Sequence, residues 1–400
     1  MSGAPGKPAP LCVMLVAAEA SGDTLGAELA RALRCRLGAD RVGVVGVGGA
    51  RMAQEGVESP FDISALSVLG LLEGLLAYRR VVACADQAAD LAQREAPDVA
   101  VLIDSWGFTL RVAQRLRRRL PALPIIKYVA PQVWASRPGR AKTLARSVDH
   151  LLAIHSFDAP YFEPEGLPTT FVGNATLARD FSTADPQRLR AQLGVSAEAP
   201  LLLVLPGSRP AEIARVMPSF EDAVARLRAA WPGLEVVVAA AASVAEAVRA
   251  RMAAWAPGAH LVEDDQARYD AMKAATVALA CSGTVTTELA LAGCPMVVGY
   301  RIGKVTYTLL KPLIRTPYAS LINIAAKAEI APEFIQGRCT GPLLAAAVGA
   351  RLDDAALRRR QIDQQNAALE VMGRGMPDPS QTAAEVIANF LGRRAEIGGA

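Results

Sequence analysis

The amino-acid sequence predicts an α/β protein built from two Rossmann-like domains, each a parallel sheet covered by helices. Short apolar runs of strand length alternate with helical segments along most of the chain. This alternation occurs in two successive series, which we expect to be linked within residues 174–198. The length of 400 residues suits two domains of about 200 residues each, and a hydrophobic content of 52% is enough for two cores.

The first series predicts domain 1–175. A helix is expected over residues 23–37, because Leu25, Leu29, Leu33 and Leu37 form a row at four-residue spacing. A basic helix is expected over residues 111–120. Strands are expected at residues 11–18, 42–47, 99–103, 125–129 and 151–154. Strands that alternate with helices in this way pair in parallel.

The second series predicts domain 176–350, and the two sheets are expected to face each other across a cleft. Its strands are expected at residues 201–205, 235–239, 277–280 and 296–299. Its helices are expected at residues 217–230, 244–255, 269–275 and 286–292. The remaining segment, 351–400, is polar and helical, and would cross back to the first domain or exchange with a partner chain.

Composition limits the function. The net charge of +4 is small and the basic clusters lack interleaved aromatic residues, so we expect no nucleic-acid partner. Six widely spaced cysteines and three histidines predict no metal site, and the cysteines are typical of small core residues in a reducing compartment. No window of 18 uncharged apolar residues occurs, so a membrane-spanning protein is not expected.

Two strand ends in the second series favour an anion site. The run 201–205 ends at Pro206-Gly207-Ser208-Arg209, and the run 277–280 ends near Ser282-Gly283-Thr284. Both turns open helices, whose first N–H groups attract anions, and Arg209 adds a planar cation. Glu288 would suit the helix dipole or bind a ribose hydroxyl. The pair favours a nucleoside diphosphate, although a helix N-cap would explain the Ser-Gly-Thr turn equally well.

The motifs of other nucleotide sites are missing. GxxxxGK[ST] does not occur, and no GxGxxG follows the first strand, so neither an ATP-type phosphate loop nor a dinucleotide cofactor is expected. We expect no cofactor at all.

Two features of the first series can each be interpreted in more than one way. Asp104, directly after the strand at 99–103, would cap a helix, bind a ligand or act as a general base toward a hydroxyl group. Residues 64–82 are mostly apolar, with one acid, Glu73, before a pair of arginines. They form a buried helix or a patch that contacts anionic lipid. The candidate lipid contacts are Val68, Leu69, Leu72, Leu75 and Leu76.

Several long motifs in this chain resemble the lipid-A-disaccharide synthase family, bacterial membrane-surface glycosyltransferases with a GT-B fold. The resemblance runs from residue 19 to residue 336 and so covers most of the chain. The motifs that carry it are "EASGDTLGAELARAL", "YVAPQVWASRPGR", "LPGSRPAEI", "SGTVTTELALAGCPMVVGYR" and "SLINIAAKAEIAPEFIQ".

This resemblance implies an inverting, metal-independent transfer in lipid A biosynthesis. UDP-2,3-diacylglucosamine and 2,3-diacylglucosamine 1-phosphate would give a β-1,6-linked disaccharide and UDP. The enzyme would lie peripherally on the cytoplasmic face of the inner membrane of a Gram-negative bacterium. The family's C-terminal segment is exchanged in a dimer, so residues from Asp353 onward are a candidate for exchange in a homodimer. The residues implied as catalytic are Asp104, Arg209 and Asn323, and those implied to hold the UDP-sugar are Ser208, Arg209, Ser282, Gly283, Thr284 and Glu288.

The chain departs from the family pattern on the acceptor side. Trp106 and Thr109 replace a proline and an asparagine, and Asn174 and Ala175 replace a histidine and a proline. A related UDP-sugar transferase with another lipid acceptor therefore stays an alternative. So do a UDP-sugar 2-epimerase, a peptidoglycan-type N-acetylglucosaminyltransferase and a non-enzymatic nucleotide-sugar-binding protein. The epimerase would need several acids and a histidine in its cleft, and the peptidoglycan enzyme needs glycine-rich loops that are not found here.

Overall fold

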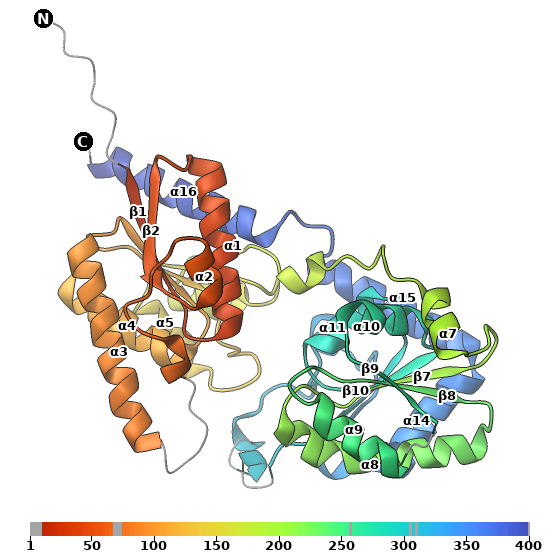
Figure 1. Ribbon diagram of the computed structural model, residues 1–400. Coiled ribbons are helices and arrows are strands. Elements are labelled where there is room, and N and C mark those ends of the chain that lie inside the picture. The colour runs from red at the N-terminus through yellow and green to blue at the C-terminus, as the bar shows by residue number, and fades with distance from the viewer. Residues whose placement is uncertain (1–9, 67–73, 256–257, 304–305, 309–310, 399–400) are drawn as a thin grey trace, which may run out of the picture. The chain divides into compact units, whose positions relative to one another are not determined.

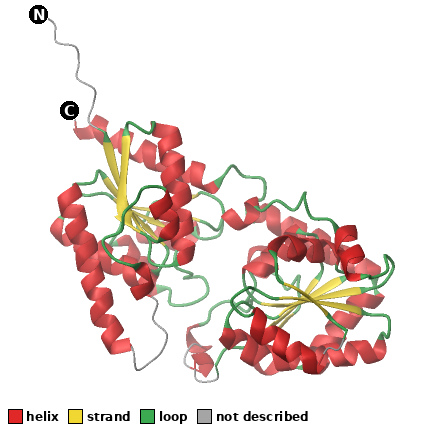
Figure 2. Cartoon of the chain, viewed as in Figure 1, coloured by secondary structure: helices red, strands yellow, loops and turns green. Residues whose placement is uncertain are grey.

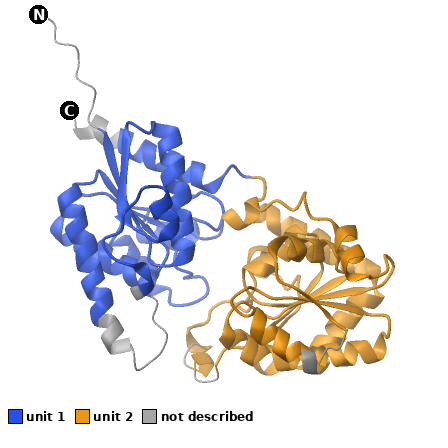
Figure 3. Cartoon of the chain, viewed as in Figure 1, with its two compact units in different colours: residues 1–174, 376–400 blue, residues 175–375 orange. Residues whose placement is uncertain are grey.

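The computed structural model describes residues 10–66, 74–255, 258–303, 306–308 and 311–398. The chain divides into two compact units (Figure 3). The first combines residues 1–174 with residues 376–400, and the second consists of residues 175–375. Each unit has a sheet enclosed by helices (Figure 2).

The sheet of the first unit is wholly parallel, with strand order β2-β1-β3-β4-β5-β6. The strands are β1 (Leu11–Val16), β2 (Val42–Val47), β3 (Val99–Ile103), β4 (Ile125–Tyr128), β5 (His150–Ala153) and β6 (Thr169–Phe171). The structure confirms the five expected strands. The sequence analysis missed β6, because three residues at a sheet edge are too few to show a period.

Helices cover both faces of this sheet (Figure 1). They are α1 (Ala20–Leu37), α2 (Ala50–Gln54), α3 (Gly74–Glu95), α4 (Trp106–Arg119), α5 (Gly139–Ala145), α6 (Ala159–Phe162) and α16 (Pro379–Gly398). The leucine row of α1 faces the core as expected, since Leu29 and Leu33 are fully buried and Leu25 and Leu37 are partly buried.

Helix α1 begins three residues before its expected start, so Asp23 lies inside the helix. The Asp23 carboxylate is buried and accepts hydrogen bonds from the backbone N–H groups of Gly49 at 2.7 Å, Arg51 at 2.9 Å and Met52 at 3.0 Å. It therefore satisfies the first N–H groups of α2 rather than those of its own helix.

The second sheet repeats the arrangement, with strand order β12-β11-β10-β7-β8-β9 and parallel pairing throughout. Its strands are β7 (Leu201–Leu205), β8 (Glu235–Ala239), β9 (His260–Val262), β10 (Val277–Cys281), β11 (Met296–Tyr300) and β12 (Glu333–Ile335). The four expected strands are confirmed. The two that were missed, β9 and β12, are again three-residue strands at the edges.

The helices of the second unit include the four expected ones, three of which begin before their expected segments. They are α7 (Pro186–Leu193), α8 (Pro210–Ala230), α9 (Ala245–Trp255), α10 (Asp265–Ala274), α11 (Thr284–Leu291), α13 (Leu321–Ala326), α14 (Gly341–Asp353) and α15 (Ala355–Val371). Helix α8 begins seven residues before the expected helix 217–230 and continues through Pro218. A proline there removes one backbone hydrogen bond, but the flanking Met217 and Ser219 are buried and keep the helix on the sheet.

The C-terminal segment does not form a unit of its own. Helix α15 belongs to the second unit, whereas α16 returns to the first and packs on α1 (Figure 1). Ala383, Ala384 and Ile387 of α16 are fully buried in the same cluster as the leucine row of α1. The first unit is therefore built from two separate stretches of the chain.

Within the described residues, no helix combines the length and apolar composition that a bilayer span requires. The candidate lipid contacts Val68, Leu69 and Leu72 lie outside the described residues. Leu75 and Leu76 belong to the first turn of α3.

The return of α16 predicts a stability effect confined to the first unit. Ile387→Ala removes a fully buried side chain, and we expect it to lower the free energy of unfolding of that unit by about 2–5 kcal/mol. Native-state hydrogen exchange of β1 and β4, compared with β7 and β10, measures this. Ile314→Ala is the matched control, because Ile314 is 44% exposed and its loss should change stability by less than about 0.5 kcal/mol. Equal loss of protection in both units would contradict the assignment.

Candidate functional site

The strand orders create one topological switch point in each sheet. In the first unit the chain leaves β1 toward β2 and returns to the other side of β1 as β3; in the second, β7 lies between β8 and β10. Ligands of open parallel sheets bind beside the carboxyl ends of the strands at such points. The predicted site residues Asp104, Arg209 and Ser282 all follow strands that meet at these switch points.

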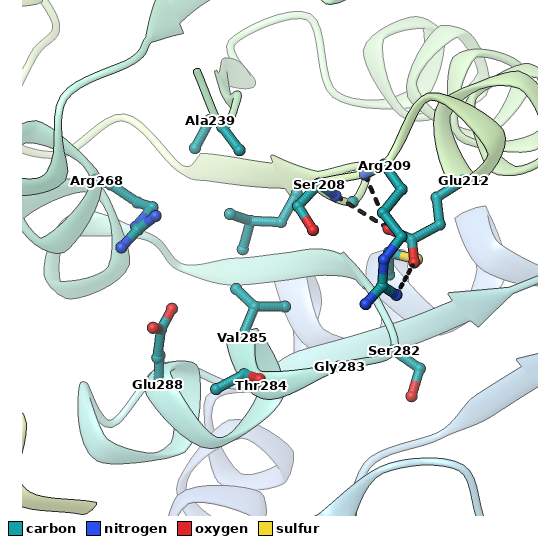
Figure 4. Close-up of a pocket in the computed structure, with 14 residues that line it drawn as sticks. Ser208, Arg209, Glu212, Ala239, Arg268, Ser282, Gly283, Thr284, Val285 and Glu288 are labelled. Atoms are coloured by element: carbon teal, nitrogen blue, oxygen red, sulfur yellow. Dashed lines mark hydrogen bonds and ion pairs between the residues drawn. The ribbon is translucent and has the colours of Figure 1, made fainter. Parts of the chain in front are cut away.

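A pocket of about 270 Å³ lies at the carboxyl ends of β7, β8 and β10 (Figure 4). It brings together all six residues expected to hold the UDP-sugar. Its lining consists of Leu205, Gly207, Ser208, Arg209, Glu212, Ala239, Ala241, Arg268, Cys281, Ser282, Gly283, Thr284, Val285 and Glu288. Burial raises the pKa of the Cys281 thiol to about 12, so this thiol is uncharged at neutral pH.

The Pro206-Gly207-Ser208-Arg209 turn is closed by a carboxylate from its own helix (Figure 4). Glu212 accepts hydrogen bonds from the backbone N–H groups of Ser208 at 3.0 Å and Arg209 at 3.2 Å. The Arg209 guanidinium donates to the same carboxylate at 3.1 Å. The turn thus already binds an anionic group, the Glu212 carboxylate, and the sequence analysis did not predict this contact. The Arg209 side chain is 76% exposed, which leaves it room to reach a second anion.

The opposite wall of the pocket is the start of helix α11. Thr284 and Val285 lie in its first turn, where backbone N–H groups have no partner within the helix. The Ser282 hydroxyl donates to the backbone carbonyl of Ala319 at 3.1 Å. This contact ties the turn after β10 to the segment that precedes α13.

Two arginines that the sequence analysis did not single out flank Glu288. The Glu288 carboxylate is buried and forms an ion pair with Arg179, which follows residues 175–178. Arg268 of α10 points toward Glu288 across the pocket (Figure 4). It bonds Asp265 at 2.9 Å and lies over the Tyr269 ring, with its guanidinium carbon 5.3 Å from the centroid.

The Arg268 Nε atom is buried and has no hydrogen-bond partner among the described residues. A buried donor that faces a pocket without a partner costs stability unless a ligand completes it. The sequence analysis overlooked Arg268 because it lies within a helix, away from the strand-end turns that mark the rest of the site.

Asn323 lies behind the pocket wall and is fully buried. Its amide nitrogen donates to the Ala331 carbonyl and to Glu333, and its amide oxygen accepts from the N–H groups of Ile330 and Ala331, at 2.7–3.0 Å. These four bonds use the whole hydrogen-bonding capacity of the amide. All hydrogen bonds of the Asn323 side chain are therefore made within the protein.

Asp104 follows β3 in the first unit, within a turn of unusual backbone conformation. Asp104 and Ser105 have φ values of +48° and +36°, in the left-handed region that side chains other than glycine avoid. The Asp104 carboxylate is partly exposed and accepts a hydrogen bond from the Ser21 hydroxyl at 3.3 Å. Ser21 belongs to the helix after β1, so both strands of the switch point contribute.

The departures from the family pattern lie in two places. Trp106 opens α4, and the guanidinium carbon of Arg140 lies 5.0 Å from its ring centroid. Burial and the nearby Arg137 lower the pKa of Arg140. Thr109 is buried in the same helix, whereas Asn174 and Ala175 flank the boundary between the two units.

Comparison with known proteins gives a consistent result. A family model described as lipid-A-disaccharide synthetase matches residues 13–387. The lipid-A-disaccharide synthase of Rhodospirillum centenum is 41% identical over 385 residues, covering 96% of each chain. Two solved structures share the fold. The kitacinnamycin glycosyltransferase has a TM-score of 0.61 and 17% identity, and the match covers 96% of this chain and 100% of that chain. The Neisseria meningitidis UDP-GlcNAc 2-epimerase bound to UDP-GlcNAc has a TM-score of 0.55 and 11% identity, and the match covers 96% of this chain and 100% of that chain. The predicted α/β, GT-B fold class is confirmed.

The orphaned Nε atom predicts that Arg268 binds a nucleoside diphosphate. With UDP as the probe, Arg268→Met should weaken binding about tenfold, because a charge-assisted hydrogen bond contributes about 1.5–3 kcal/mol. Isothermal titration calorimetry measures the dissociation constant. Arg249→Met is the control, since Arg249 pairs with Glu263 at the surface of α9 and lines no part of this pocket. Equal affinity in wild type and Arg268→Met would remove Arg268 from the site.

Proposed function

Because the chain belongs to the lipid-A-disaccharide synthase family, we propose that it condenses UDP-2,3-diacylglucosamine with 2,3-diacylglucosamine 1-phosphate, giving the β-1,6-linked lipid A disaccharide and UDP. The observation that carries this proposal is the family match over residues 13–387, together with a pocket at the second switch point that gathers the expected nucleotide contacts. The reaction is a glycosyl transfer with inversion at the anomeric carbon.

On the donor side, UDP occupies the pocket with its diphosphate between Arg209 and the start of α11. Arg209 is exposed, and we propose that it moves from Glu212 onto the diphosphate. The helix N–H groups and the guanidinium stabilise the negative charge that develops on the leaving group. Glu288 lies deeper in the pocket wall and binds the ribose, and Arg268 adds a second cation.

On the acceptor side, the 6-hydroxyl group attacks the anomeric carbon from the face opposite the diphosphate. The new C–O bond forms as the bond to the phosphate oxygen breaks, and its electron pair leaves with UDP. The Asp104 carboxylate accepts the hydroxyl proton as general base. Ser21, which donates to Asp104 at 3.3 Å, orients the carboxylate. Arg140, held against Trp106, supplies a cation for the acceptor's 1-phosphate.

We propose that Asn323 acts by positioning. Its amide donates to Glu333, and Glu333 accepts from the N–H groups of Ala319 and Ser320 at 2.6 and 2.8 Å. Ala319 in turn accepts from the Ser282 hydroxyl at 3.1 Å. This buried network fixes one side of the nucleotide pocket without direct contact between Asn323 and substrate.

A UDP-sugar 2-epimerase is the second candidate, because such an enzyme shares the fold. No histidine lines the pocket described above, although the epimerase reaction was expected to need one. The relative that is 41% identical over 96% of this chain is a lipid-A-disaccharide synthase. Transfer is therefore the better-supported activity.

We further propose that the protein lies peripherally on the cytoplasmic face of the inner membrane, where both lipid substrates are presented. The apolar residues 64–82 and the exposed Arg79 and Arg80 support this, since apolar side chains flanked by cations bind anionic bilayer surfaces. Exchange of the C-terminal segment in a homodimer would require the contact between α16 and α1 to form between two chains.

Binding and transfer should separate in two variants. Arg209→Ala should abolish transfer and weaken UDP binding at least tenfold, because it removes the cation that meets the diphosphate. Asp104→Asn should lower kcat by about 10²–10⁴-fold, the range of general-base catalysis, and leave UDP affinity unchanged. Mass spectrometry of the disaccharide product and calorimetry with UDP report the two effects. Near-wild-type turnover in Arg209→Ala would refute its role, and lost UDP binding in Asp104→Asn would place Asp104 on the donor side.

The lipid patch is tested with vesicles. Leu71→Glu combined with Leu75→Glu should release the protein from vesicles that contain anionic lipid, because two carboxylates oppose both burial and surface charge. Co-sedimentation measures the bound fraction, and circular dichroism shows whether the variant is folded. A folded variant that still sediments contradicts the proposal, whereas an unfolded one favours a core helix.

A further inference from the structure

A lysine is buried in the middle of the first sheet. Lys127 belongs to β4, which pairs with β3 on one side and β5 on the other, and only 3% of its surface is exposed. Its neighbours along the strand, Ile125, Ile126 and Tyr128, are fully buried. A charged amino group in such surroundings loses its hydration and is retained only where it is well hydrogen-bonded.

The partners of Lys127 lie in the turn that carries Asp104. The Nζ atom donates to the backbone carbonyl of Asp104 and to the Thr109 hydroxyl, the latter at 2.9 Å. The Thr109 hydroxyl lies 2.9 Å from that same Asp104 carbonyl and 2.9 Å from the Ser105 carbonyl. Two buried side chains from different elements therefore converge on one peptide group beneath the Asp104 side chain.

This peptide group belongs to the strained part of the turn. The left-handed φ values of Asp104 and Ser105 are unfavourable for residues other than glycine and persist only where surrounding contacts hold them. The Lys127 bond is such a contact, because it fixes the carbonyl that joins the two residues. Relaxation of the turn would rotate the Asp104 carboxylate away from Ser21.

We propose that Lys127 is a positioning residue for glycosyl transfer, which fixes the Asp104 carboxylate by clamping the left-handed turn beneath it. This inference rests on the proposed function, in which Asp104 accepts the proton of the acceptor hydroxyl. Lys127 itself touches neither substrate. Thr109, the other half of the clamp, is a departure from the family pattern, so the clamp belongs to the form of the turn found in this chain.

The ionisation of Lys127 agrees with this role. Burial lowers the pKa of its amino group to about 7, while the charge of Asp104 acts in the opposite direction. The ammonium form has three N–H donors and the neutral amine has two. Two are enough for the Asp104 carbonyl and the Thr109 hydroxyl, so the clamp holds in either protonation state.

Three variants test the proposal. Lys127→Met keeps the length of the side chain and removes the donor, Lys127→Gln retains an N–H donor, and Lys273→Met makes the same change at an exposed lysine of α10. For Lys127→Met we expect kcat to fall about 10- to 100-fold, since small misplacements of a catalytic group have effects of this size. Lys127→Gln should recover part of this loss, and Lys273→Met should match wild type.

Binding and stability measurements separate positioning from a general structural defect. The KM for the donor and the Kd for UDP should stay within about twofold of wild type, because the nucleotide pocket is built from residues of the second unit. The melting temperature of Lys127→Met should change little, because the loss of the bond to the Asp104 carbonyl is offset by removal of the cost of burying the amino group.

Several outcomes would overturn the proposal. They are an unchanged kcat in Lys127→Met, or a lower kcat that accompanies a lower melting temperature and is not improved in Lys127→Gln. Should Lys127→Met fail to fold, Thr109→Val removes the second donor to the same carbonyl, and an unchanged kcat there would also refute the clamp. Failure of the proposed function is distinct, because wild-type protein would then form no disaccharide from the two lipid substrates.

Discussion

Parallel pairing is the constraint on which the rest of this molecule depends. Every neighbouring pair of strands in both sheets runs parallel, so the carboxyl ends of all strands in a unit meet at one edge. A crossover helix must follow each strand, and its N-terminus starts at that same edge. Polar turns, helix N–H groups and the ends of buried strands are thereby concentrated at the switch points of the two sheets. The nucleotide pocket and the Asp104 turn are two products of this single arrangement.

Charges at these sites are arranged in pairs before any substrate arrives. Arg209 is held by Glu212, and Glu288 is held by Arg179. Such pairing keeps the turns ordered and offsets the cost of placing charges near a sheet edge. In the proposed function, a diphosphate would gain its contacts by exchange, displacing a carboxylate from a guanidinium rather than filling a free cationic site. Arg268 is likewise paired with Asp265, but its buried Nε donor has no partner among the residues that the structure describes and offers an interaction that requires no exchange.

The sequence was sufficient for the order of elements and for the position of the pocket. Runs such as 201–205 and 99–103 are buried on both sides and read as continuous apolar strands, and the turns after them contain residues of obvious chemical use. Three-residue strands at the sheet edges are too short to show a hydrophobic period. Pro218 obscured the start of α8, because the packing of the helix on the sheet outweighs the tendency of proline to break helices. Arg268 and Lys127 were missed for another reason, because each belongs to a regular element. Arg268 matters because it lines the pocket, and Lys127 matters because of a partner in another element. Thr109 lies 18 residues from Lys127, and only the pairing of β3 with β4 brings them together.

The return of α16 to the first unit also constrains how the protein is made. During synthesis the first 174 residues leave the ribosome early, yet their sheet lacks the cover that Ala383, Ala384 and Ile387 provide. The second unit is continuous in sequence and precedes those residues in the chain. One apolar face of α1 in the N-terminal half therefore stays uncovered until almost the whole chain has been synthesised. For this protein, completion of the N-terminal unit therefore comes at the end of synthesis rather than at its beginning.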